Sequence, residues 1–113
     1  MDLDDVKRDI LRSGLKDLIG LWETEKVVES YQPDLSPEQR RGVALEQIRF
    51  LLVEGLMVAG DRTPSGFVPS KAEPHETLAG IQSKWRALEG ELTPVDEAWF
   101  KLSETGRRAL SGT

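Results

Sequence analysis

Residues 99–110, WFKLSETGRRAL, are the part of the sequence that most clearly indicates the fold. The apolar piece 98–102 predicts a β-strand, which runs directly into Leu-Ser-x-x-Gly. A serine after a strand, here Ser103, can cap the next helical turn, and Gly106 lets two backbones approach closely. Leu110 would then return to the core. The stretch therefore predicts a closing strand followed by a short helix or turn over 103–110.

The clearest helix start lies earlier in the chain, at Ser36, Pro37 and Gln39. Serine is a favoured N-cap, proline suits the first helical position, and glutamine at the third completes a capping box. We expect this helix to run from Pro37 to about Glu54, with Gly55 as its stop. Apolar residues mark two of its faces, so it should be packed on two sides as the central helix. One face carries Ala44, Leu45, Ile48, Leu51 and Leu52, and the other carries Val43, Phe50 and Val53.

Helical spacing of apolar residues predicts three further elements, over 3–19, within 21–31 and over 74–90. Thr24 is a candidate N-cap for the second of these, with Trp22, Val27, Val28 and Tyr31 expected to face inward. Short strands are expected on either side of the turn-forming stretch RTPS, within 56–61 and 66–69. Trp22 and Trp99 are expected in the core.

This order of elements resembles the winged-helix domains of bacterial regulators such as the MarR and PadR types. In those domains the third helix ends in Leu-x-x-x-Gly-Leu-(apolar), and the last wing strand ends in Leu-Thr-x-x-Gly-x-x-Leu. The matching residues here are Leu51, Gly55, Leu56 and Val58, then Leu102, Ser103, Gly106 and Leu110, with serine in place of threonine. The resemblance implies an α+β, mainly α, winged-helix-like fold. We expect four to five helices and a small antiparallel sheet of two to three strands, in a single domain over 1–113.

One segment departs from that family pattern. About thirty residues, roughly 69–97, lie between the two expected wing strands and include the amphipathic helix that carries Trp85. A wing that reads DNA is normally a short basic hairpin. The resemblance therefore supports the fold more than the usual DNA-binding role.

The bulk composition limits the function classes. The 113 residues contain no cysteine, and 20 acids against 15 bases give a net charge of −5. The absence of cysteine excludes disulfides and zinc–cysteine sites. An acidic balance disfavours non-specific phosphate binding. No apolar run approaches the roughly 20 residues that span a bilayer, and the acidic start does not resemble a secretory signal. We therefore expect a cytoplasmic protein that does not bind membranes.

Candidate catalytic and metal-binding groups are few. The single histidine, His75, begins the fourth predicted helix and is expected to be solvated. Asp4, Asp5 and Asp9 could bind a divalent cation, but acids at a helix start more often complement the helix dipole. Ser103 has no nucleophile elbow around it, and DRTPSG lacks the spacing of a phosphate loop. We expect no enzymatic activity, no cofactor and no metal.

Two binding functions remain open. We favour a small non-catalytic binding or regulatory module that acts through protein–protein interaction with a partner or with a second copy. Candidate contacts for it are Asp2, Asp5, Asp9 and Trp85. The alternative is a DNA-binding transcriptional regulator, in which the helix 37–54 reads duplex DNA. Its candidate residues are Arg40, Val43 and Gln47 for bases, and Arg62 and Lys71 for phosphates.

The two functions predict different surfaces. A DNA reader should gather its cations, Arg40, Arg41, Arg49, Arg62 and Lys71, on one exposed face. A protein-binding module should instead show an acidic face or an apolar patch near Trp85. Arg41 is placed by helical spacing beside Ala44 and Ile48, where its stem would lie along the core and its guanidinium could pair with an acid.

Overall fold

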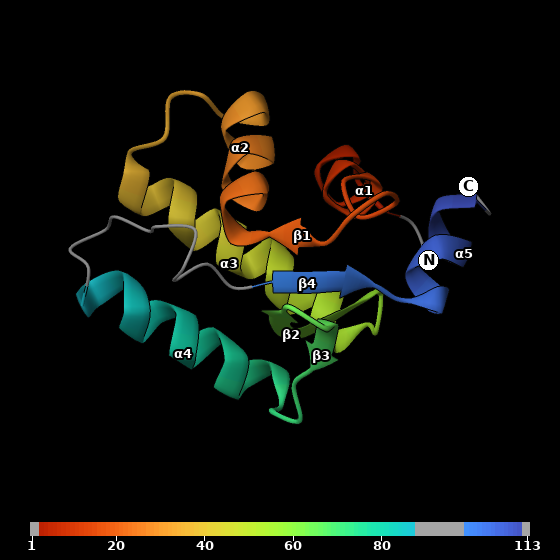
Figure 1. Ribbon diagram of the computed structural model, residues 1–113. Helices are drawn as coiled ribbons and strands as arrows, with labels where there is room; N and C mark the ends of the chain where they lie inside the picture. The colour runs from red at the N-terminus through yellow and green to blue at the C-terminus, as the bar shows by residue number, and fades with distance from the viewer. Residues whose placement is uncertain (1–2, 88–98, 112–113) are drawn as a thin grey trace.

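The computed structural model describes residues 3–87 and 99–111, without the side chains of 84–87 (Figure 1). The helices are α1 (Asp5–Arg12), α2 (Leu21–Tyr31), α3 (Pro37–Val53), α4 (Pro74–Ala87) and α5 (Glu104–Ser111). The strands are β1 (Ile19–Gly20), β2 (Met57–Thr63), β3 (Gly66–Pro69) and β4 (Trp99–Leu102). The predicted fold class, α+β and mainly α, is confirmed, with five helices in the part of the chain described.

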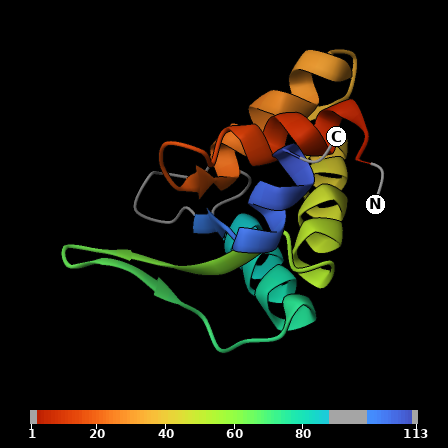
Figure 2. The ribbon, with the colours of Figure 1, turned by 90° about the vertical axis from the view of Figure 1, so that its right-hand side faces the viewer.

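The strands form one antiparallel sheet in the order β1-β4-β2-β3. β4, the last strand in the sequence, therefore lies between β1 and β2. Phe100 of β4 is fully buried and pairs with Ile19 on one side and Ala59 on the other. β2 and β3 continue beyond the end of β4 as a long hairpin that extends away from the helices (Figure 2). The sheet thus has one strand more than the two to three expected.

The additional strand is β1, and it corrects the helix predicted over 3–19. α1 is capped by the side chain of Asp4 and ends at Arg12, and the chain turns at Ser13 and Gly14. A Cβ at Gly14 would lie 2.9 Å from the Ile19 side chain, so the glycine makes room for the chain to fold back. Ile19 is buried by pairing with Phe100 rather than on a helix face.

α2 begins at Leu21, earlier than its predicted cap. Gly20 is its N-cap, and Thr24 lies inside the helix, fully buried, with its hydroxyl donating to the Gly20 carbonyl (3.2 Å). Its inward face is Leu21, Thr24 and Val28, spaced three and four residues apart. The inward placement predicted for Trp22 and Tyr31 is wrong, since they are 58% and 43% exposed.

α3 has the predicted start and stop. The Ser36 hydroxyl accepts from the Gln39 N–H (3.1 Å), and the Gln39 side chain accepts from the Ser36 N–H (3.0 Å). Gly55 follows the helix with a φ of +71°, which glycine adopts without strain. The core face is as predicted in Ala44, Leu45, Ile48 and Leu51, and α2 and α4 both pack on the helix. The prediction of a second buried face, made of Val43, Phe50 and Val53, is wrong in part, because Val53 faces solvent.

The helix predicted over 74–90 is α4, and it packs against α3 (Figure 1). Its Ile81 is buried in the same core as Ile48 and Phe100, and Leu78 packs against that core. The inserted segment is thus joined to the main core rather than held apart from it. Trp99, expected in the core, is only half-buried, because alternation along β4 places it on the opposite face from Phe100.

The step from β4 into α5 holds the sheet to the end of α3. The Ser103 hydroxyl donates to the Gly55 carbonyl (2.6 Å) and accepts from the Gly106 N–H (2.9 Å). The Ser103 N–H donates to the Leu56 carbonyl (3.2 Å). A Cβ at Gly106 would lie 2.1 Å from that same carbonyl oxygen. The Leu-Ser-x-x-Gly stretch therefore has the capping and close-packing roles expected of it, and both act on the turn between α3 and β2.

Gly106→Ala should lower the free energy of unfolding by about 2–3 kcal/mol, because the new methyl group would displace the Leu56 backbone. Gly80→Ala is the matched control, since position 80 also lies in a helix but has open space around it. That change should leave the stability unaltered or raise it by up to about 1 kcal/mol. Urea unfolding followed by circular dichroism measures both, and equal effects of the two substitutions would contradict this account.

Candidate functional site

The outward face of α3 combines an exposed apolar residue, an acid, a base and a glycine. Gly42, Glu46, Arg49 and Val53 are all exposed and lie on one side of the helix, opposite Ala44, Ile48 and Leu51 of the core. We call these four residues the α3 stripe. Val53 is 63% exposed, more than any other large apolar side chain in the described part of the chain. Exposing a valine to this degree on the central helix forgoes the stabilisation that its burial would give.

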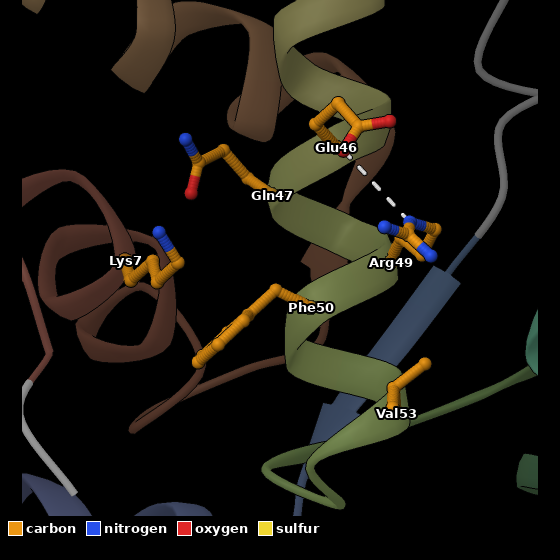
Figure 3. Close-up of a pocket in the computed structure, with 6 residues that line it drawn as sticks. All are labelled: Lys7, Glu46, Gln47, Arg49, Phe50 and Val53. Carbon is orange, nitrogen blue, oxygen red and sulfur yellow. Dashed lines mark ion pairs between the residues drawn. The ribbon is translucent and has the colours of Figure 1, made fainter.

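A shallow hollow of about 280 Å³ lies beside the stripe, between α1 and α3 (Figure 3). Its lining residues are Lys7, Glu46, Gln47, Arg49, Phe50 and Val53. Phe50 points toward α1, where the Lys7 ammonium lies 4.9 Å from the centre of its ring (Figure 3). Gln47 also points toward α1, and its buried Oε1 has no hydrogen-bond partner. The hollow thus combines the aromatic ring of Phe50, the exposed side chain of Val53 and the Gln47 Oε1, which accepts no hydrogen bond.

The charges next to this hollow are paired within the chain. Arg49 Nε lies 3.8 Å from Glu46 Oε2 across one helical turn, and both side chains are largely exposed. Such an exposed pair contributes little to stability, so its charges remain available to a partner. Lys7 Nζ lies 2.8 Å from Asp4 Oδ2. The hydrogen bonds from the Lys7 side chain and backbone hold the pKa of the Asp4 carboxyl below its ordinary value.

The residues predicted to read bases do not form an exposed line on α3. Arg40 turns toward α2, where its guanidinium lies 3.4 Å from Glu29 and 3.9 Å from Glu25, and its side chain is only 23% exposed. Val43 and Gln47 are half-buried. Arg41 has the placement expected of it, with its Nε 3.7 Å from Glu25.

The predicted phosphate contacts lie elsewhere. Arg62 belongs to the β2–β3 hairpin, which extends away from α3 (Figure 2). Its guanidinium lies 4.9 Å from the centre of the Trp99 ring. Lys71 is exposed in the connection between β3 and α4. The five cations of the DNA-reading hypothesis are therefore not gathered on one exposed face.

The predicted acidic contacts on α1 are partly used within the fold. Asp9 accepts from Arg12 (3.3 Å) and from the hydroxyl of Tyr31 on α2. Asp5 is exposed in the first turn of α1. Asp2 and the side chain of Trp85 lie outside the described residues. The protein contacts predicted from the sequence lie largely on α1. The α3 stripe was not among them, although helical spacing alone puts its four residues on one face.

Other classes of site find little support in the described residues. His75 is exposed at the first turn of α4, as expected. Within 3–87 and 99–111, no group of three or more His, Asp or Glu residues is arranged to hold a metal ion. None of the helices described has the length and apolar character needed to cross a membrane.

Comparison with known proteins adds no family. No protein-family model, curated protein or solved structure matches the chain.

The contact between Asp9 and Tyr31 predicts a pH dependence. The bond to the Asp9 carboxylate raises the pKa of the Tyr31 phenol above its ordinary value near 10, because it favours the neutral phenol. This α1–α2 contact therefore stabilises the fold below about pH 10 and is lost as the pH rises through the folded-state pKa. The chain has one tyrosine, so phenolate absorbance reports Tyr31 alone. Asp9→Asn should move that titration down toward the ordinary pKa, and an unchanged titration would exclude the contact.

Proposed function

We propose that this chain is a small non-catalytic binding or regulatory module, and that it acts through protein–protein interaction at the α3 stripe. The observation that carries the proposal is Val53, which is 63% exposed on the outward side of the helix that organises the core and lines the same hollow as Phe50. Protein–protein interfaces are enriched in arginine, and the stripe places Arg49 next to this exposed apolar side chain. A helix supported by α2 and α4 also needs little ordering when a partner binds.

The pairing of the α3 cations supports this proposal over duplex DNA. Each arginine of α3 has a carboxylate within 4 Å: Arg40 and Arg41 meet α2, and Arg49 meets Glu46. A DNA phosphate would have to displace these carboxylates, and Glu46 on the exposed face would repel it. A protein partner can instead offer both signs of charge to the Glu46–Arg49 pair.

Purified protein should show no binding to a fluorescent random-sequence duplex at about 50 mM salt, where phosphate contacts are strongest. Fluorescence anisotropy measures this directly. Binding that weakens steeply at about 200 mM salt and is lost in Arg40→Ala would instead support the regulator alternative.

Protein binding is tested by site-specific photo-crosslinking. A p-benzoylphenylalanine at exposed position 38, one turn before the stripe on α3, should form adducts in native cell extract, and the same group at exposed position 107 on α5 serves as the matched control. Adducts at position 38 that mass spectrometry identifies as one defined protein, and that disappear when Val53→Asp is added, would support the proposal. Adducts that form equally at both positions, or that persist in the Val53→Asp protein, would contradict it.

A further inference from the structure

We propose that the protein bound by the α3 stripe is a second copy of this chain, with the two α3 helices antiparallel about a twofold axis. This inference rests on the proposed function, because it uses the same surface and names its partner. It follows from a symmetry in the positions and chemistry of the four stripe residues.

The spacing of the stripe reads the same in both directions along the helix. Gly42 and Glu46 are four residues apart, Glu46 and Arg49 three, and Arg49 and Val53 four. In an antiparallel pair of identical helices, a twofold axis between positions 46 and 49 places Glu46 of each copy opposite Arg49 of the other. The same axis places Gly42 opposite Val53. No other register aligns all four residues with one another.

The outer positions of this register are complementary in shape. Val53 projects from the helix with 63% of its surface exposed. Gly42 is exposed, and a Cβ built there would have no heavy atom within 4 Å. The position opposite each valine is therefore an open notch in the helix surface, which lets the second backbone approach closely.

The inner positions are complementary in charge. Each copy presents one carboxylate and one guanidinium, already 3.8 Å apart within the helix. Antiparallel pairing would extend the two pairs into an alternating group of four charges across the axis. Phe50 and the hollow beside α1 lie next to this group and provide apolar surface at its edge. The area of one helix pair is small, so we expect a weak dimer with a dissociation constant on the order of 10–100 µM.

Sedimentation equilibrium of the purified protein at about 0.15 M salt, where long-range repulsion between acidic molecules is screened, measures the association. We expect reversible dimerisation, lost in both Glu46→Arg and Arg49→Glu, because each single variant places like charges across the axis. An equimolar mixture of the two variants should form dimers again, since every arginine of one variant then faces a glutamate of the other. The double variant E46R/R49E should also dimerise. Loss in each single variant, with recovery in both the mixture and the double variant, is the pattern expected when position 46 of one copy faces position 49 of the other.

The notch is tested separately by Gly42→Leu, which fills it without disturbing the monomer. Position 42 has open space, so the variant should fold at least as stably as the parent protein while losing the dimer by tenfold or more in affinity. Gly80→Leu is the matched control, because Gly80 is also an exposed helical glycine with open space around it. It should dimerise like the parent protein.

A protein that stays monomeric to about 1 mM, or variants that do not recover on mixing, would overturn this inference, because weak symmetric contacts are populated at that concentration. The proposed function would survive that result if the position 38 adducts in cell extract contain a different protein. It would fail together with this inference if those adducts do not depend on Val53. The two proposals are thus distinguished by the identity of the adduct and by the mass of the purified protein.

Discussion

The hydrogen bonds of Ser103 hold the two halves of this fold together. One serine side chain joins the carbonyl after α3 to the first turn of α5, and its backbone N–H binds the carbonyl at the start of β2. These bonds fix β4 in register with β2, and β4 in turn holds β1. The close approach works only because position 106 has no side chain. The arrangement of α3, on which the candidate surface lies, therefore depends on a contact made almost fifty residues later in the chain.

Ion pairs determine which charges of α3 are compensated within the fold. Near the N-terminal end of the helix, Arg40 and Arg41 form ion pairs with Glu25 and Glu29 of α2. Their positive charge is thereby compensated inside the fold. The exposed stripe is left with one acid, one base, one glycine and one valine, a nearly neutral set on an acidic molecule. A surface without excess positive charge lacks the electrostatic attraction for a polyanion that a basic surface has.

Much of the fold was predictable where the cause is local. The capping box at Ser36 and Gln39, the glycine after α3 and the Leu-Ser-x-x-Gly step are chemical signals within a few residues, and the structure confirms them. β1 was not predictable, since two residues carry no periodicity and Ile19 is a strand residue only because Phe100 pairs with it. The exposure of Trp22 and the direction of Arg40 depend on how α2 lies against α3. The α3 stripe was not predicted for a related reason, because helical spacing shows which residues share a face but not whether a neighbouring helix covers that face.

The central position of β4 has a consequence for synthesis in the cell. β1 and β2 do not pair with one another in the sheet, and each meets β4, which is made some forty to eighty residues later. A chain emerging from the ribosome therefore carries α1 to α4 while β1 has no strand partner and β2 is paired on one side only, with β3. Sheet closure must wait for long-range pairing, which is slow and leaves strand edges and apolar surface open to other chains.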